Sequence, residues 1–175
     1  MLIACHLFFG AASGLLLQNR FKSRYILPAC VLGSVLPDLI DKPLGYIIFP
    51  SIGDGRLIAH SLMGLTIILL ITTALFRNKY ITVALGIGIM THQILDEMWK
   101  IPVNWFYPLL GPFPVYQMEN YFGWGLMREL TTPSEYLFAL GLLFLLISRT
   151  ENNLIRERAG ILSGASALLL LLTGR

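Results

Sequence analysis

Hydrophobic residues occur along this chain in long blocks that are separated by short polar stretches. The blocks run over residues 2–17, 25–40, 57–76, 80–96, 134–148 and 159–173. Each could form a helix that crosses, or nearly crosses, the ~30 Å hydrocarbon core of a bilayer. Several blocks are shorter than the ~20 residues of a full span, so flanking residues or local thinning of the bilayer would have to complete them. The pattern predicts an all-α fold, a polytopic membrane bundle of about six transmembrane helices.

No linker and no internal repeat divides the chain, so we expect one transmembrane domain over residues 1–175. The first block lacks a basic region before it and carries His6, which favours a retained helix over a signal peptide. Cys5 and Cys30 both lie inside hydrophobic blocks, and we expect packed thiols rather than a disulfide.

Aromatic residues and prolines are concentrated in residues 97–133, between the fourth and fifth blocks. All three tryptophans, Trp99, Trp105 and Trp124, lie here. The prolines disfavour one continuous helix, and amphipathic rings favour the depth of the lipid headgroups. We therefore expect an interfacial or re-entrant cap at 97–133. Its end, Thr132-Pro133-Ser134-Glu135, is typical of an N-cap, a proline at the first helical position and a capping-box glutamate.

The composition supports a membrane protein and excludes one class of partner. Hydrophobic residues make up 55% of the chain and charged residues 13%, whereas soluble domains carry about 25% charged residues. Basic residues form no run with interleaved aromatic residues, so a nucleic-acid partner is not expected. The expected partners are membrane lipids and a lipid or amphiphilic substrate.

Basic residues gather in the three loops that share one side of the predicted bundle. They are Arg20, Lys22, Arg24, Arg77, Lys79, Arg149, Arg156 and Arg158. Under the positive-inside rule this side faces the cytoplasm. Both termini and the loops 41–56 and 97–133 then face the non-cytoplasmic side of the cell (inner) membrane.

Ionisable residues at or inside the hydrophobic blocks share the opposite, outer end of the predicted helices. They are His6, Asp38, Asp41, Arg56, His60, His92, Asp96 and Glu135. Such groups cost from ~3 to more than 10 kcal/mol inside a bilayer, so they persist when they are paired, hydrated or bound to a metal. Because the chain crosses the membrane between these positions, their shared depth does not follow from proximity in the sequence.

The spacing and type of these residues favour a metal site. His92 and Asp96 are four residues apart, which puts them on one helix face about 6 Å apart. Arg56 and His60, which are expected to open a helix, have the same spacing. Imidazole with carboxylate suits zinc, with manganese or iron as alternatives, better than magnesium or calcium. The predicted ligands are His6, Asp38, His60, His92 and Asp96.

Each residue also has a structural explanation that involves no ligand. A histidine near a helix end is commonly an interfacial hydrogen-bonding residue, Asp38 after Pro37 suits a turn, Glu135 suits a cap and Arg56 suits an interface anchor. The joint occurrence of three histidines and two acids at one depth favours the site over these separate explanations.

The ordered motifs also resemble a known family. His6 is followed by Gly33-Ser34-Val35-Leu36-Pro37-Asp38, then by Arg56-Leu57-Ile58-Ala59-His60-Ser61, then by Thr91-His92-Gln93-Ile94-Leu95-Asp96. Over roughly residues 1–115 this order resembles the LexA-regulated, membrane-bound metal-dependent hydrolases of the inner membrane. That family looks distantly similar to zinc-dependent phospholipase C and P1-type nuclease. Its pattern has a histidine where this chain has Gly55, and its two aspartates are two residues apart, whereas Asp38 and Asp41 are three apart. One or two ions, rather than a larger cluster, are therefore expected.

The resemblance implies a membrane-embedded metal-dependent hydrolase, phosphoesterase-like, that acts on a lipid phosphoester or a similar amphiphile at the outer leaflet. Arg56 would bind a phosphate oxygen through its guanidinium, and Lys42 would assist in substrate binding. Arg56, Asp41 and Glu135 are the predicted catalytic residues. Two alternatives stay open: a metal-ion transporter, and a non-catalytic scaffold with a structural metal or polar cluster. Transport needs polar groups at several depths, and the inner half of the predicted helices has few.

Overall fold

The computed structural model describes residues 3–115, 123, 127, 131–148, 160–166 and 168. These residues form helices and no strand, which confirms the predicted all-α class. The elements are α1 (Ile3–Phe21), α2 (Ile26–Gly33), α3 (Leu36–Pro43), the π-helical turn η1 (Leu44–Ile48), α4 (Leu62–Phe76), α5 (Lys79–Leu95), the 3₁₀ turn η2 (Met98–Lys100), α6 (Pro102–Trp105) and α8 (Pro133–Ile147). Residues 160–166 are also helical.

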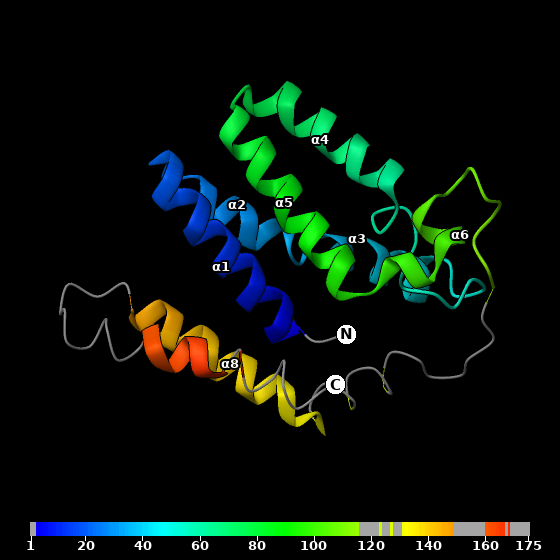
Figure 1. The fold of residues 1–175 in the computed structure, drawn as a ribbon. Helices are drawn as coiled ribbons and strands as arrows, with labels where there is room; N and C mark the ends of the chain where they lie inside the picture. The colour runs from blue at the N-terminus through cyan, green and yellow to red at the C-terminus, as the bar shows by residue number, and fades with distance from the viewer. Residues whose placement is uncertain are drawn as a thin grey trace.

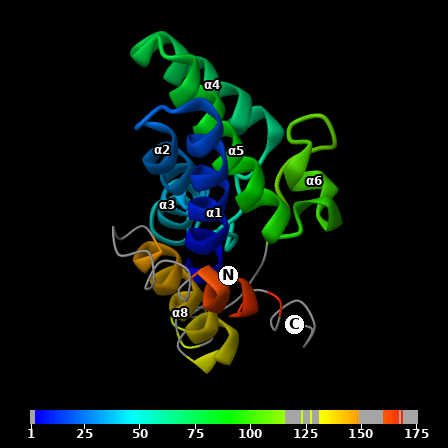
Figure 2. The same ribbon diagram turned by 60° about the vertical axis from the view of Figure 1, so that its left-hand side comes forward.

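Helix α5 is the centre of the bundle, because it packs against α1, α2 and α4 (Figure 1). Helix α8 lies along α1, and the turned view keeps the two side by side (Figure 2). Phe138 of α8 packs against Phe8 and Phe9 of α1, with ring centroids 5.8 Å apart in both pairs. On the other side of α1, the buried Cys30 of α2 packs against Ala84 of α5.

Two glycines set the close approach of α2 and α5. A methyl group on Gly33 would overlap the carbonyl oxygen of Leu85, and one on Gly88 would overlap the carbonyl oxygen of Cys30. Only a residue without a side chain therefore fits at either position. The consequence is that the backbone just after α2, at Ser34, lies directly against α5.

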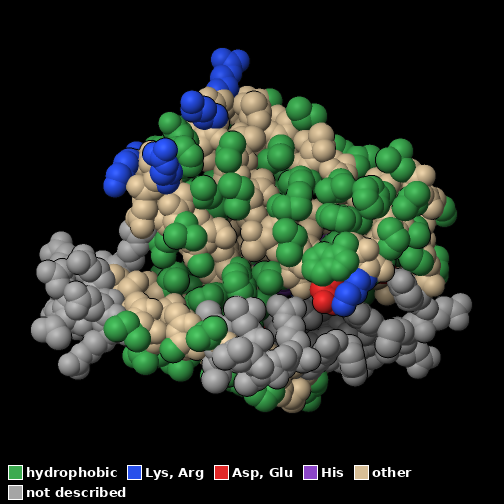
Figure 3. Space-filling view, viewed as in Figure 1, with side chains coloured by type: hydrophobic (Ala, Val, Ile, Leu, Met, Phe, Trp, Pro, Cys, Tyr) green, Lys and Arg blue, Asp and Glu red, His purple; other side chains and the backbone are tan. Residues whose placement is uncertain are grey.

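Much of the outer surface is apolar. On α4, Leu70, Leu75 and Phe76 expose 66%, 72% and 60% of their surface, while the helix buries little beyond Gly64 and Leu65. Figure 3 shows hydrophobic side chains over most of one face and a cluster of Lys and Arg side chains at one end. Of the helices that the structure describes, none combines the length with the apolarity that a membrane span requires.

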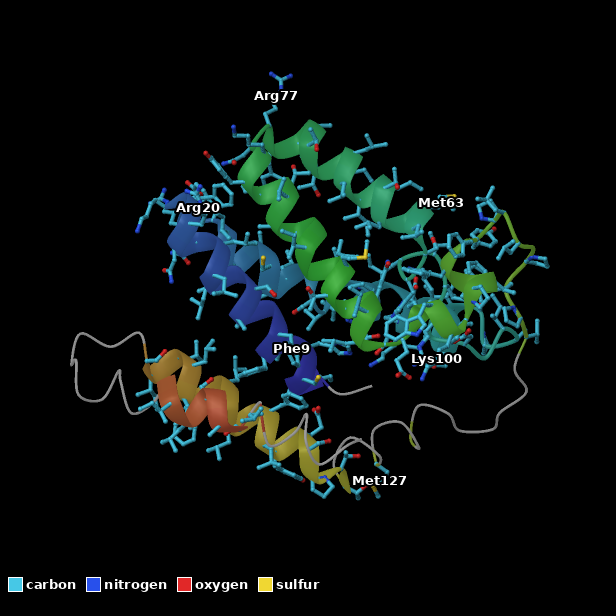
Figure 4. All side chains as sticks on the ribbon, in the orientation of Figure 1. Phe9, Arg20, Met63, Arg77, Lys100 and Met127 are labelled. Atoms are coloured by element: carbon cyan, nitrogen blue, oxygen red, sulfur yellow. The ribbon has the colours of Figure 1, made fainter. Side chains whose placement is uncertain are left out.

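Basic residues from two of the three predicted cytoplasmic loops lie at one end of the bundle. Arg20 at the end of α1 and Arg77 after α4 lie at one end, and Lys100 lies beyond α5 at the other (Figure 4). Arg149, Arg156 and Arg158 are outside the described residues. Which end faces the cytoplasm stays a prediction.

Several boundaries differ from the predicted ones. The second block breaks after Gly33, because Pro37 has no N–H to bond the Gly33 carbonyl four residues earlier, and a new helix, α3, starts at Leu36. Within residues 97–115 the predicted cap contains only the short helices η2 and α6. Trp124 lies outside the described residues. Cys5 and Cys30 are free and buried, as expected for packed thiols.

The predicted capping box at the start of α8 is wrong in one respect. Thr132 is the N-cap and Pro133 begins the helix, but the Thr132 side chain makes no cap hydrogen bond. Glu135 instead accepts hydrogen bonds from the backbone N–H groups of Ala4 (2.9 Å) and Cys5 (3.4 Å). A carboxylate at the first turn of another helix satisfies free N–H groups there and complements the helix dipole. Glu135 therefore fastens α8 to the start of α1.

Candidate metal centre

The predicted ligands come together where α1 begins and α5 ends. One donor atom from each of Asp38, His60, His92 and Asp96 can be chosen so that all four lie within 4.8 Å of one another. All four residues are buried. Asp38 comes from α3, His60 from the loop before α4, His92 from α5 and Asp96 from the C-cap of α5. Such a group could hold a metal ion.

Asp41 fixes the loop that carries His60. Its carboxylate accepts hydrogen bonds from the backbone N–H groups of Leu57 (2.8 Å), Ala59 (3.0 Å) and His60 (3.0 Å). It also lies 2.8 Å from Nδ1 of the His60 ring. Because Asp41 takes these N–H groups, the residues before Ser61 are not helical.

The expected helix start at residue 57 is therefore wrong. Helix α4 begins at Leu62 after Ser61, whose hydroxyl accepts from the N–H of Gly64 (2.9 Å). Arg56 and His60 consequently share no helix face, although the fold brings both to the same site.

The Nδ1 contacts define which nitrogen of each imidazole is free. The carboxylate of Asp41 can only accept a hydrogen bond from Nδ1 of His60. The backbone carbonyl of Ser34, 2.7 Å from Nδ1 of His92, likewise only accepts. In the neutral form both rings therefore carry their proton on Nδ1 and present a lone pair at Nε2. The geometry of the α2–α5 crossing thus orients His92.

The two free nitrogens face each other. Nε2 of His60 lies 3.1 Å from Nε2 of His92, and both side chains are fully buried. Two lone pairs at this separation repel each other unless a proton or a cation lies near both. The donor set therefore fits a metal ion, and nitrogen with carboxylate oxygen is the set that zinc, manganese or iron takes.

The carboxylates complete the set of donors. Oδ1 of Asp38 lies 3.4 Å from Nε2 of His60 and 3.7 Å from Nε2 of His92. This buried oxygen has no hydrogen-bond partner among the described residues, while Oδ2 of Asp38 pairs with Lys42 at 3.0 Å. Oδ2 of Asp96 lies 3.8 Å from Nε2 of His60. A buried acceptor without a hydrogen-bond partner, beside imidazole nitrogens, is available as a donor to a cation.

His6 lies against this group rather than among its four donor atoms. Its ring stacks on His92, with centroids 4.1 Å apart and an interplanar angle of 25°. Its Nε2 lies 3.2 Å from Oδ1 of Asp96, without the geometry of a hydrogen bond. All five predicted ligands therefore lie in one place. Four of them form the donor group, and His6 lies against that group in contact with His92 and Asp96.

The remaining predicted site residues lie in different places. Arg56 donates from Nε to Oδ2 of Asp96 at 3.2 Å, and its side chain is 30% exposed. Lys42 lies beside Asp38. The contacts of Glu135 are with the first turn of α1.

The structure adds residues that the sequence reasoning missed. Asp54 accepts from the backbone N–H of Arg56 (3.0 Å) and from the side-chain amide of Asn104 (2.9 Å). Burial raises the pKa of the Asp54 carboxyl, and the hydrogen bonds from Arg56 and Asn104 oppose that rise. An aspartate two residues before Arg56 is typical of a turn that bonds its own backbone, and this was the available sequence signal. Gln93, next to His92, also contacts the loop.

The fold and this cluster define an all-helical protein with a buried histidine–aspartate site that could hold a metal ion. The chain belongs to the YdjM inner membrane protein family, whose sequence profile matches residues 1–174. No curated protein and no solved structure matches the chain. The family confirms the membrane part of the predicted localisation. The hydrolase activity and the similarity to phospholipase C and P1-type nuclease stay predictions.

Proposed function

We propose that this protein is a metal-dependent hydrolase of the inner membrane, acting on a lipid phosphoester or a similar amphiphile at the non-cytoplasmic leaflet. The observation that carries the proposal is the pair of facing Nε2 atoms of His60 and His92, 3.1 Å apart beside the unpartnered oxygen of Asp38. Asp38, His60, His92 and Asp96 would hold the ion, with His6 as a further donor. Zinc is the most favoured ion, with manganese or iron as alternatives. Bound there, such an ion supplies Lewis acidity, which activates water near neutral pH.

The residues around the four donors have distinct roles in this proposal. Asp41 and the carbonyl of Ser34 hold the two imidazoles in the tautomer that leaves Nε2 free, as the outer partners of metal-binding histidines do. The hydrogen bonds that Asp41 accepts favour positioning over direct contact with the substrate. The glutamate that was predicted as catalytic, Glu135, has a capping role in its described contacts.

Arg56 and Lys42 are the cationic groups for substrate binding. The guanidinium of Arg56 lies beside Asp96 and reaches solvent, so it can bind a phosphate oxygen close to the donor cluster. The ammonium of Lys42 lies beside Asp38 at the rim, with 23% of the side chain exposed. Two cations next to a metal-binding group match a phosphoester, because its oxygens carry the negative charge that develops during hydrolysis.

Exposed apolar side chains in the segments that follow α3 and α6 favour an amphiphilic substrate. Ile47 and Ile48 end η1 and Phe49 follows it, and these residues expose 75%, 58% and 52% of their surface. Leu109 and Leu110, after α6, expose 84% and 55%. Together with membership of an inner membrane family, these side chains support a substrate with an acyl or prenyl portion.

The test combines metal content with turnover. The protein would be purified without added metal, analysed for zinc, manganese and iron, and assayed against a panel of phosphoesters and lipid esters. His92→Ala is expected to lose metal and activity together, whereas Arg56→Ala should keep the metal and lose turnover of phosphorylated substrates. Metal without hydrolysis of any panel member would favour the transporter or the scaffold instead.

A further inference from the structure

The loop of residues 54–61, which carries Arg56 and His60, is held from outside by a side chain of α6. Asn104 is fully buried, and its amide nitrogen donates to the carbonyl of Arg56 (2.7 Å) and to Oδ2 of Asp54 (2.9 Å). Asp54 in turn accepts from the N–H of Arg56 (3.0 Å). Because both partners of Asn104 are acceptors, the orientation of its amide is fixed. Asn104 therefore ties both backbone polar groups of Arg56, one directly and one through Asp54.

A second connection starts from the next residue of α6. Trp105 donates from its indole N–H to Oε1 of Gln93 (2.9 Å). The amide nitrogen of Gln93 donates to the carbonyls of Ala59 (3.4 Å) and Ser61 (3.3 Å), the residues on either side of His60. Gln93 is fully buried and follows His92 in α5. Trp105 thus acts on the backbone around His60 through Gln93.

We propose that Asn104 and Trp105 are positioning residues that clamp the 54–61 loop. Asn104 determines the position of Arg56, and Trp105 determines the position of His60. A loop without regular backbone hydrogen bonds keeps a fixed geometry only where side chains bind its N–H and C=O groups. Asp41 binds the N–H groups of this loop, and the clamp binds its carbonyls. The effect on substrate binding rests on the role proposed above for Arg56, but the effect on the loop does not.

The first measurement is hydrogen exchange of the backbone amides, using the full chain purified in detergent. Asn104→Ala and Trp105→Phe should each raise exchange in residues 54–61 about tenfold, because each removes a buried hydrogen bond of the clamp. Two variants at the opposite end of the bundle are matched controls. Asn78→Ala removes the side-chain cap of α5, and Tyr80→Phe removes one hydroxyl from an aromatic ring. Both should leave exchange in residues 54–61 unchanged.

The second measurement separates the two halves of the clamp. Asn104→Ala should keep the zinc content and raise KM for a phosphoester about tenfold with little change in kcat, because it displaces the group that binds phosphate. Trp105→Phe should weaken zinc binding about tenfold, the lower end of the loss that removal of an outer partner causes, because Trp105 acts on the backbone around His60 only through Gln93. In an Arg56→Ala background, Asn104→Ala should cause no further fall in the residual kcat/KM, since its effect passes through Arg56.

Unchanged exchange in both variants would overturn the clamp, whatever the activity. A further fall in the residual kcat/KM from Asn104→Ala in the Arg56→Ala background would overturn the assignment of Asn104 to Arg56. If the wild-type protein holds no metal and hydrolyses nothing, the proposed function is wrong. The hydrogen-exchange result alone then decides whether Asn104 and Trp105 hold the 54–61 loop.

Discussion

His60 and His92 meet through their Nε2 atoms at 3.1 Å, while a hydrogen-bond acceptor holds Nδ1 of each ring. The acceptors come from Asp41 of α3 and from the backbone of Ser34 after α2. Two separate parts of the fold therefore aim two imidazole lone pairs at one point. A structural network of histidines would be more stable with one nitrogen donating to the other. Because both Nδ1 atoms already donate, the two Nε2 atoms need either an added proton or a bound cation between them, and a bound cation has consequences that can be measured.

Removing metal should destabilise the protein. A bound ion stabilises the folded state by about 3–4 kcal/mol at 100 to 1,000 times its dissociation constant. A chelator should therefore lower the Tm of the wild-type protein, and added zinc should restore it. His92→Ala should show neither response. Glu97→Gln, which neutralises an exposed carboxylate next to Asp96, should respond like the wild type. A wild-type Tm that is insensitive to chelator would mean that the cluster is a polar network without a metal.

Asp41→Asn should damage both the loop and the metal site. An amide offers one acceptor oxygen in place of two and turns its NH₂ toward groups that also donate, so buried N–H groups lose their partners. The expected loss of unfolding free energy is more than about 2 kcal/mol. Zinc affinity should fall about 10- to 100-fold, because the tautomer of His60 is no longer fixed. Chemical denaturation and zinc titration measure the two effects, with Glu97→Gln again as the matched acid-to-amide control. Zinc affinity that stays at the wild-type value would contradict the positioning role of Asp41.

Glu135→Ala separates a capping role from a catalytic one. Because its carboxylate binds the first N–H groups of α1, its loss should cost about 1 kcal/mol of stability. Zinc content and turnover per folded molecule should be those of the wild type. Thermal unfolding and a turnover assay on the same preparation distinguish the roles. Loss of turnover at unchanged stability would restore Glu135 as a catalytic residue.

The charge asymmetry of the bundle predicts its orientation. Single cysteines replacing Lys22 and Lys79 should resist an impermeant thiol reagent in intact cells, since the basic end is expected to face the cytoplasm. A cysteine replacing Lys100, whose side chain is 62% exposed at the other end, should react. Asn104 is unsuitable as a reporter because it is fully buried. The native Cys5 and Cys30 are buried and should give little background. Labelling at Lys22 and Lys79 but not at Lys100 would reverse the assignment.

The sequence by itself determined where the main helices lie and which residues meet. The blocks of hydrophobic residues predict the bounds of α1, α5 and α8 to within a few residues. Such bounds can be read from the sequence because the pattern of hydrophobic residues along a short stretch is the main local signal for a helix. The spacing of His92 and Asp96 is a property of one helix, and the two do lie in the same donor group. A common predicted depth was sufficient to predict that Asp38 and His60 would join them, and it also brought His6 against the group, although His60 lies in a loop and not on a helix.

Only the tertiary structure decided how these residues are held. The 54–61 loop is irregular because Asp41, Gln93 and Asn104 bind its backbone from other parts of the chain, and hydrogen bonds over 16 to 48 residues leave no local pattern in the sequence. The free nitrogen of His92 depends on the carbonyl of Ser34, which reaches α5 because Gly33 and Gly88 let two backbones touch. Composition and spacing determine which groups share one end of the bundle, whereas the tautomers and the separation of 3.1 Å follow from contacts that form only when the helices pack.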